Sequence, residues 1–139
     1  MRPDALAFLR GSDEIIHAGD IGDPAILEQL GKIAPVTAVR GNNDRGPWAK
    51  RIPHANALKV GNVSIYVLHD VKELDFAPAA AGHRVVVAGH SHKPLVKEND
   101  GVLYVNPGSA GPRRFTLPIA VGELKINGAS VRARIKELA

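Results

Sequence analysis

Val85–Ala88 is an apolar run that ends at Gly89-His90-Ser91-His92, and this junction constrains the fold more than any other segment. Four apolar residues in succession predict a buried strand, and the glycine after them predicts a loop. Two imidazoles two residues apart point to one side of an extended backbone, and glycine allows the close approach of a ligand. The segment therefore predicts metal binding at the carboxyl edge of a sheet.

The first half of the chain alternates helical and extended patterns, and the second half is rich in hairpin signals. Asp23 followed by Pro24 is a strong helix start, because aspartate caps the first turn and proline fits its first position. The expected helices are Pro3–Arg10, Asp23–Gly31 and a short one over Asp75–Ala81 that Pro78 weakens; the expected strands are Asp13–Ala18, Val36–Val39, Leu58–Val60, Val63–Leu68, Arg84–Ala88, Lys93–Glu98, Val102–Val105, Ile119–Ile126 and Ala129–Lys136. This order predicts one α/β domain over residues 1–139, with two packed sheets and helices outside them.

The composition narrows the class of protein. The 139 residues include no cysteine, which excludes disulfides and thiolate metal sites and fits a cytoplasmic protein. No apolar run approaches the ~18 residues of a membrane span, and the N-terminus lacks the pattern of a signal peptide. The net charge is +4, but the basic residues are scattered and aromatic residues make up only 4%. We therefore expect a cytoplasmic protein that binds neither membrane nor nucleic acid.

Three further segments resemble Gly89–His92, which we call the histidine loop. In each of them a glycine or a metal-binding side chain follows an apolar run. They are His17-Ala18-Gly19-Asp20, Arg40-Gly41-Asn42-Asn43-Asp44 and Leu68-His69-Asp70. One aspartate, one asparagine and three histidines suit a divalent ion such as Mn, Fe, Ni, Co or Zn. A carboxylate can bridge two ions, and a pair of ions activates water to hydroxide for phosphoryl transfer.

These motifs, in this order, resemble the calcineurin-like metallophosphoesterases, and most closely their small YfcE-like phosphodiesterase branch. The matching segments are Gly19-Asp20, Gly41-Asn42-Asn43-Asp44, His69, Gly89-His90-Ser91-His92 and Asn106-Pro107-Gly108-Ser109. Each motif is weak alone, but all of them occur in family order after a plausible strand, over nearly the whole chain. The resemblance implies a four-layer α/β/β/α sandwich of two mixed sheets.

The resemblance also implies a role for each motif residue. The implied metal ligands are Asp20, Asn42, His69, His90 and His92. Asp20 is the implied carboxylate that bridges the two ions. Asn42, His69 and His90 belong to one metal site, and His92 belongs to the other. Asn42 and Asp44 are the implied catalytic residues: Asn42 also touches the substrate phosphate, and Asp44 supports its motif. The full family site holds two divalent ions.

Two further residues are expected to face the substrate. Asn43 occupies a position at which many relatives carry a histidine that protonates the leaving group. Asparagine cannot serve as a general acid at neutral pH, so good leaving groups are favoured. Arg113 follows the turn at Asn106–Ser109 and is within reach of a phosphate, although a role in a solvated loop fits it equally well.

The chain departs from the family pattern at its N-terminus. The family opens with a strand that ends in Asp-x-His, whereas this chain begins at what should be the first helix. The first sheet would then lack its usual N-terminal strand, and the second metal site would retain only Asp20 and His92. Two interpretations stay open: Met1 is an internal methionine of a longer natural chain, which we favour, or the protein is a one-metal or inactive derivative.

The sequence thus predicts a metal-dependent phosphoesterase that hydrolyses small phosphodiesters by a metal-activated hydroxide, with its activity impaired if the strand is truly absent. The alternative is a non-catalytic protein-binding scaffold of the same fold, like a retromer subunit. The expected partner is a small phosphate-ester substrate, and homo-oligomerisation stays open. His17 is expected to be a packing residue or a residue behind the ligands, and the turn at Asn106–Ser109 is expected to support the site.

Overall fold

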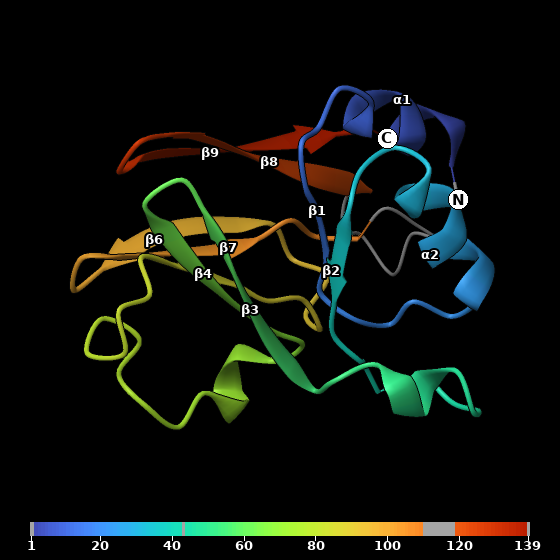
Figure 1. Cartoon of the computed structure of the whole chain (residues 1–139), viewed down its shortest axis with the longest axis horizontal. Helices are drawn as coiled ribbons and strands as arrows, with labels where there is room; N and C mark the ends of the chain where they lie inside the picture. Colours follow the sequence, from blue (N-terminus) through green and yellow to red (C-terminus); the bar gives the residue numbers. More distant parts are fainter. Residues whose placement is uncertain (1, 43, 110–118, 139) are drawn as a thin grey trace.

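The computed structural model describes residues 2–42, 44–109 and 119–138 (Figure 1). Helices α1 and α2 cover Pro3–Leu9 and Pro24–Gly31, and the short 3₁₀ helices η1 and η2 cover Ala49–Arg51 and Val71–Glu73. The strands are β1 (Ile15–His17), β2 (Val36–Ala38), β3 (Ala55–Val60), β4 (Val63–Leu68), β5 (Val85–Val87), β6 (Leu95–Asn99), β7 (Val102–Asn106), β8 (Ala120–Asn127) and β9 (Ser130–Glu137). None of the helices in the described ranges is long and apolar enough to cross a membrane.

The expectation of a helix over Asp75–Ala81 is wrong. The carbonyl of Pro78 instead accepts hydrogen bonds from the N–H groups of Ala81 and His83, at 3.2 and 2.9 Å, and these close a turn. Proline has no N–H group, so a helical ladder cannot continue through this segment. The other expected helices and strands are confirmed, with ends that shift by a few residues.

The centre of the molecule is a five-stranded mixed sheet in the order β3-β4-β5-β7-β6. β5 lies in the middle, parallel to both β4 and β7, and its three valines are buried. A strand that is covered on both faces needs such an uninterrupted apolar run. The hairpins β3–β4 and β6–β7 add the outer strands. The α/β class is confirmed, and β5 delivers the histidine loop to one edge of this sheet.

β1 and β2 form a separate parallel pair that lies between the helices and the five-stranded sheet. Ile15 packs in a cluster with Leu30 of α2, and Leu9 of α1 lies against this cluster. Ile16 packs instead against the core of the five-stranded sheet. Because successive side chains of a strand point to opposite faces, β1 buries both of its faces and its position is fixed from both sides.

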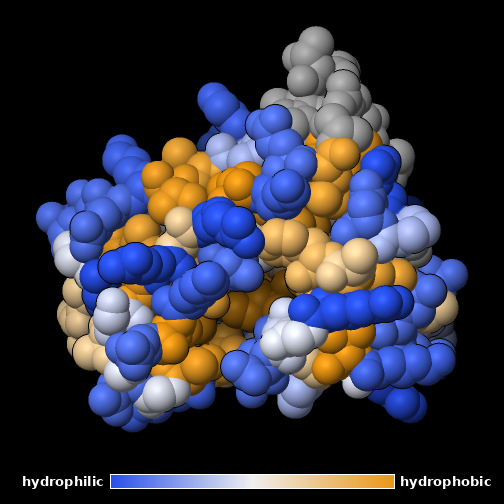
Figure 2. Space-filling view, turned by 90° about the horizontal axis from the view of Figure 1, so that it is seen from above, coloured by the Kyte–Doolittle hydropathy of each residue, from blue (hydrophilic) through white to orange (hydrophobic). Residues whose placement is uncertain are grey.

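The C-terminal hairpin β8–β9 forms a third sheet of two strands. β1 and β8 both line a groove of about 1260 Å³, and the surface seen from above is hollowed near its centre over a hydrophobic floor (Figure 2). Among the described residues, the strands outside the five-stranded sheet therefore form two pairs, one parallel and one antiparallel, in place of one continuous second sheet.

Candidate functional site

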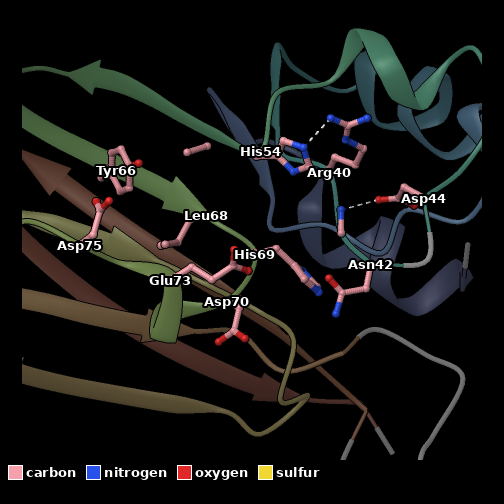
Figure 3. Close-up of a pocket in the computed structure, with 12 residues that line it drawn as sticks. Arg40, Asn42, Asp44, His54, Tyr66, Leu68, His69, Asp70, Glu73 and Asp75 are labelled. Carbon is pink, nitrogen blue, oxygen red and sulfur yellow. Dashed lines mark hydrogen bonds between the residues drawn. The ribbon is translucent and has the colours of Figure 1, made fainter.

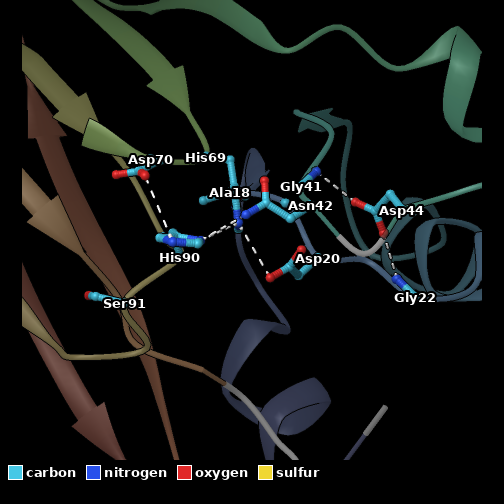
Figure 4. A network of polar contacts seen from close by, with 12 residues as sticks. Ala18, Asp20, Gly22, Gly41, Asn42, Asp44, His69, Asp70, His90 and Ser91 are labelled. Carbon is cyan, nitrogen blue, oxygen red and sulfur yellow. Dashed lines mark hydrogen bonds and ion pairs between the residues drawn. The ribbon is translucent and has the colours of Figure 1, made fainter. Parts of the chain in front are cut away.

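Four loops that follow different strands meet at one edge of the fold (Figure 4). Gly19-Asp20 comes after β1, Gly41-Asn42 after β2, His69-Asp70 after β4 and Gly89-His90 after β5. The carboxyl ends of parallel strands share one edge of a sheet, which is where open α/β folds place their ligands. The structure thereby gathers four of the predicted ligands, which lie up to 70 residues apart in the sequence.

The donor atoms of these four residues form a chain of short contacts. Oδ2 of Asp20 lies 3.3 Å from Nε2 of His69, and that nitrogen lies 3.3 Å from Nδ1 of His90. The amide nitrogen Nδ2 of Asn42 lies 3.3 Å from the same Nδ1. Asparagine binds metal through its amide oxygen, so the amide must turn over to present that oxygen to an ion. Two donors bound to one ion at about 2.1 Å in tetrahedral geometry lie roughly 3.4 Å apart. The Asp20–His69 and His69–His90 pairs therefore have the spacing of ligands that share an ion.

The side chains of these residues lie in a row and do not surround a common point. Within the described ranges, no three His, Cys, Asp or Glu side chains surround one point closely enough to hold a metal ion. The donor set suits a divalent ion by chemical type and by pairwise spacing. Binding would require the four side chains to close around the ion by rotation.

Contacts behind the two central histidines decide which ring nitrogen faces the site. Nδ1 of His69 lies 2.7 Å from the carbonyl oxygen of Ala18 and donates to it, which leaves the lone pair of Nε2 facing the site. Nε2 of His90 lies 3.8 Å from Oδ2 of Asp70, and its Nδ1 faces the site. A carbonyl or carboxylate behind an imidazole is the usual way in which a metal-binding histidine is oriented.

The backbone is strained at three predicted ligands. Asp20, His90 and His92 have φ angles of 54°, 66° and 59°. Among the described residues, only one other non-glycine residue has a positive φ, Asp100 (51°), which lies in the turn of the β6–β7 hairpin. Positive φ is uncommon outside glycine, and such strain gathers at functional sites. His92 lines the groove between β1 and β8 together with Asp20.

Two glycines allow the loops to approach one another. A Cβ atom on Gly41 would collide with the backbone nitrogen of Asp20, and one on Gly19 would collide with the ring of His69. No side chain fits between these loops, so glycine is required at both positions. The glycines in the sequence motifs are thus explained by the close packing of the ligand loops.

Asp44 joins the loop after β1 to the loop after β2. It is buried, and its two carboxylate oxygens accept hydrogen bonds from the N–H groups of Gly22 and Gly41, at 2.9 and 2.8 Å. A carboxylate that accepts hydrogen bonds from two backbone N–H groups makes a strong and directional link between the segments that carry them. Asp44 therefore holds together the loops that carry Asp20 and Asn42.

His17 lies behind the site, as the sequence suggests. Burial lowers the pKa of His17 below its usual value, an effect that the nearby carboxylates of Asp44 and Asp20 oppose. Its Nδ1 accepts a hydrogen bond from the N–H group of Gly19 at 3.2 Å, which requires an unprotonated nitrogen. The neutral ring of His17 thus supports the glycine that precedes Asp20.

The side chain of Asn106 holds the histidine loop in place. Its amide nitrogen donates to the carbonyl oxygen of Gly89 and to Oγ of Ser91, at 2.9 and 3.0 Å. Its amide oxygen accepts from the N–H group of Gly108 at 2.9 Å. The expected supporting role of the Asn106–Ser109 turn has a specific cause, since one amide connects this turn to the loop that carries His90 and His92.

A pocket of about 580 Å³ opens beside Asn42 and His69 (Figure 3). Arg40 and His54 lie on one side of it, joined by a 2.6 Å hydrogen bond, and Tyr66 lies on another. The carboxylates in its lining are Asp44, Asp70, Glu73 and Asp75. Sequence reasoning missed Arg40, although a basic residue directly before the Gly41 motif is a signal that was available.

Two predicted site residues, Asn43 and Arg113, lie outside the described residues. Their expected contacts with substrate stay predictions. The remaining predicted residues all lie at the edge reached by the four loops or line the adjoining groove.

Comparison with known proteins decides the family. The model of the calcineurin-like phosphoesterase superfamily domain matches residues 1–128, which is most of the chain. The chain belongs to the calcineurin-like phosphoesterase superfamily. The resemblance of its motifs is thereby confirmed, and the site at the loop edge is the candidate site of a phosphoesterase-family protein.

Relatives of this phosphoesterase-family chain carry related names. A probable metallophosphoesterase of Methanothermobacter thermautotrophicus is 32% identical over 133 residues, which cover 91% of this chain and 76% of the relative. A phosphodiesterase of Methanocaldococcus jannaschii is 26% identical over 110 residues, which cover 69% of this chain and 66% of the relative. The crystal structure of a Vps29 variant from Entamoeba histolytica shares the fold, with a TM-score of 0.78 and 19% identity over 99% of this chain and 90% of that one.

Proposed function

We propose that this protein hydrolyses small phosphodiesters with the help of divalent metal ions held by Asp20, Asn42, His69 and His90. The observation that carries the proposal is the contact of the Asp20, His69 and His90 ligand atoms, each 3.3 Å from the next, at one edge of the fold. The amide of Asn42 lies beside His90 at the same edge. Family membership supports phosphoester chemistry, and the relative named a phosphodiesterase supports the substrate class.

Each residue of the site contributes a defined part of this chemistry. Divalent ions bound there would activate a water molecule and neutralise charge on the phosphate oxygens. Asn42 is exposed beside His90, so its amide is placed to donate a hydrogen bond to a phosphate oxygen. As the water oxygen, which has released a proton to solvent, bonds to phosphorus, the bond from phosphorus to the leaving-group oxygen breaks. The leaving group departs as an anion and takes its proton from solvent. Asp44 takes no proton in this scheme, because both of its oxygens already accept backbone N–H groups.

The leaving group would depart without help from an acid at position 43, because Asn43 has no titratable proton. We therefore propose that activity is highest on esters whose leaving alcohol is acidic, such as a phenol. The pocket beside Asn42 and His69 offers space for that group, with Tyr66 as an aromatic wall and Arg40 as a cation.

The test is hydrolysis of bis-p-nitrophenyl phosphate by the purified chain with Mn²⁺, Ni²⁺ or Zn²⁺, followed by release of p-nitrophenol. We expect metal-dependent turnover that a chelator stops. His69→Gln should reduce it at least tenfold, because the ring nitrogen shared by two donor contacts is lost.

The matched control is His83→Gln. His83 bonds Ser64 near the end of β4 opposite to His69, and its ring packs against Tyr66. Metal binding by this variant should therefore be unchanged, and any change in turnover should lie in KM. The absence of metal-dependent turnover by the unaltered chain with any of the three ions would refute the proposed activity.

A second candidate function is a non-catalytic binding scaffold, and the open arrangement of the donors favours it. The shared fold of Vps29 is compatible with this alternative. Calorimetric titration with Mn²⁺ or Zn²⁺ separates the two candidates. Tight binding that His69→Gln removes supports the enzyme, and no measurable binding supports the scaffold.

A further inference from the structure

The leaving group of the hydrolysis proposed above departs as an anion, because position 43 holds an asparagine with no proton to give. An anion that leaves without a proton is stabilised by a fixed positive charge beside it. The pocket beside Asn42 and His69 is where this group would lie. The charged side chains of the pocket therefore decide which leaving groups the site accepts.

Arg40 is a cation of this pocket that pairs with no carboxylate. Its Nη2 atom donates one hydrogen bond, to Nε2 of His54 at 2.6 Å. Its Nε atom is buried, and no acceptor among the described residues meets it. The arginine ion pairs in the described ranges use Arg2, Arg84 and Arg134 instead. The guanidinium thus keeps N–H groups that can donate to a bound anion.

Two hydrogen bonds fix the position of Arg40. Its backbone N–H group donates to the carbonyl oxygen of Pro53 at 2.8 Å, and its side chain donates to the next residue, His54. Nε2 of His54 can accept this bond only when it carries no proton, so the neutral ring orients the guanidinium without adding a competing charge. Arg40 is therefore the group that would meet a substrate, and His54 is a positioning residue.

Two carboxylates of the lining are already satisfied by other groups. Asp44 accepts hydrogen bonds from two backbone N–H groups. Asp70 accepts from the N–H group of Lys72, and its other oxygen lies 3.8 Å from Nε2 of His90. Neither carboxylate forms an ion pair with Arg40 within the described ranges.

The other two carboxylates of the lining are exposed, and they give the pocket two ends of opposite charge. Glu73 and Asp75 form no ion pair with any described residue. Asp75 lies beside Tyr66, at the far end of the pocket from Arg40 and His54 (Figure 3). An anion in this pocket is therefore attracted to the end that holds Arg40 and repelled from the end that holds Asp75.

The loop that leads from Asp44 to β3 adds to the positive charge at the Arg40 end. Arg45, Lys50 and Arg51 are exposed on this loop, and residues 45–69 contain neither aspartate nor glutamate. None of the three cations forms an ion pair within the described part of the chain. A surface of one sign raises the local concentration of ions of the opposite sign, so this loop favours an anionic group beside Arg40.

Phosphate meets both requirements that the pocket places on a leaving group. It is a much more acidic leaving group than an alcohol, so it departs as an anion without prior protonation. Its oxygens also match the planar N–H groups of a guanidinium. We propose that this protein hydrolyses phosphoanhydrides, and that Arg40 binds the phosphate that leaves. This proposal rests on the phosphoesterase function proposed above and names a further class of substrate for that site.

The reaction balances without a further reactant. A water oxygen that has released a proton to solvent bonds to one phosphorus, and the bond from this phosphorus to the bridging oxygen breaks. The bridging oxygen keeps the electron pair and leaves as part of the second phosphate, whose charge Arg40 offsets. The products are two separate phosphates.

A matched pair of substrates tests the proposal. Thymidine 5′-diphosphate and thymidine 5′-(4-nitrophenyl phosphate) carry the same thymidylyl group, and both yield thymidine 5′-monophosphate, which chromatography measures. We expect turnover of both with Mn²⁺, Ni²⁺ or Zn²⁺, and at least tenfold slower turnover of thymidine 5′-(methyl phosphate), whose leaving alcohol is weakly acidic. In water labelled with ¹⁸O, the label should enter thymidine 5′-monophosphate, because the outer phosphate is the group that leaves.

Substitution of Arg40 should change the preference between the two substrates. Arg40→Gln should lower kcat/KM for the diphosphate at least tenfold more than for the nitrophenyl ester, and Arg40→Lys should restore part of the difference. The matched control is Arg84→Gln, which removes the same charge from a side chain that bonds Gly101 and Glu98. It should leave the ratio of the two kcat/KM values unchanged.

His54→Ala tests the positioning role. It should lower kcat/KM for the diphosphate in the unaltered chain, but it should cause no further loss in the Arg40→Gln background, since His54 acts through Arg40. Equal losses in both backgrounds would contradict this role.

Binding to the metal-free protein gives a readout that is independent of turnover. Inorganic phosphate is titrated while NMR follows the Nε–H signals of the arginine side chains. The signal of Arg40 should shift until it saturates, whereas that of Arg84, which is paired with Glu98, should stay in place. A signal of Arg40 that does not respond to phosphate would contradict the proposed subsite.

Three results with the substrates would overturn the proposal while the phosphoesterase function stands. One is turnover of the nitrophenyl ester without turnover of the diphosphate. Another is ¹⁸O in inorganic phosphate alone, which would place the attack on the outer phosphorus. The third is an equal loss on both substrates in Arg40→Gln. Failure of both substrates with all three ions would instead overturn the proposed function, and this inference with it.

Discussion

At the scale of residues, the histidines of this protein differ in what meets each ring nitrogen. His69 and His90 each direct one nitrogen to an oxygen behind them and the other into the site. His17 instead accepts a backbone N–H group, and this half-buried ring is neutral. Identical side chains thus divide into two that face a candidate metal site and one that supports the loop of Asp20.

The lowered pKa of His17 predicts a loss of stability in mild acid. The unfolded chain binds a proton at this histidine below about pH 6.5, while the folded protein, with its lower pKa, stays unprotonated. The unfolded state therefore holds more protons, and the free energy of unfolding should fall as the pH drops below about 6.5, until the lowered folded pKa is reached.

Urea denaturation between pH 7.5 and 5 measures this dependence. In His17→Asn the amide oxygen can still accept from Gly19, but no group titrates, so the decline should be smaller than in the unaltered protein. Equal pH dependence in the two proteins would contradict the role assigned to the burial of His17.

At the scale of elements, the strands deliver loops whose mutual position depends on a few hydrogen bonds. Asp44 ties the loop after β1 to the loop after β2, and Asn106 ties the turn after β7 to the loop after β5. Asp23 is different, because it caps the first turn of α2 through the N–H group of Ala25 at 2.9 Å. Aspartate thus links two loops at position 44 and caps the start of a helix at position 23.

Asp44→Asn is expected to destabilise the fold by about 1–3 kcal/mol, because one of the two buried backbone donors would lose its acceptor. It should also weaken divalent-ion binding, since the loops of Asp20 and Asn42 would no longer be fixed to one another. Urea denaturation and calorimetric metal titration measure the two effects.

Asp23→Asn is the matched control, because it removes the same charge while asparagine remains a good N-cap. Its stability and metal binding should stay close to those of the unaltered protein. If both variants lose stability equally, the effect of Asp44→Asn comes from charge and not from the link between the two loops.

At the scale of the whole molecule, the described strands differ in how many neighbouring strands and packed faces stabilise them. The five-stranded sheet has a central strand buried on both faces, whereas the other strands form two pairs. A pair of strands has little stability of its own and depends on what packs against it. The candidate site is built from loops that follow β1 and β2 of the two-stranded sheet and β4 and β5 of the five-stranded sheet. It therefore joins a less stable part of the fold to a more stable one.

Hydrogen exchange should show this division. We expect amides of β5 and β7 to exchange most slowly, at the rate set by global unfolding, and the paired amides of β1 and β8 to exchange faster through local opening. Exchange measured by mass spectrometry or NMR over hours tests the order. Equal protection of β1 and β5 would mean that the two parts unfold as a single cooperative unit.

Much of the site was predictable because its signals are local. Apolar runs mark the strands, a glycine and a polar side chain mark each loop, and the order of these segments places the loops at one edge. The Asp-Pro start of α2 and the two-residue hairpin turns are equally local. The helix over Asp75–Ala81 failed because local propensity competed with the lost donor of Pro78 and the turn prevailed.

The sequence by itself determined which strands of the main sheet pair as hairpins, which loops meet at the candidate site, and the family of the protein. Only the tertiary structure decided which nitrogen of His69 and His90 faces the site. It also decided that Asp44 links two loops by hydrogen bonds, and that β1 and β8 line one groove. Ring orientation, the links between loops and the lining of a groove depend on atoms that are distant in the chain. Periodicity records which residues share a face, but not what lies opposite them.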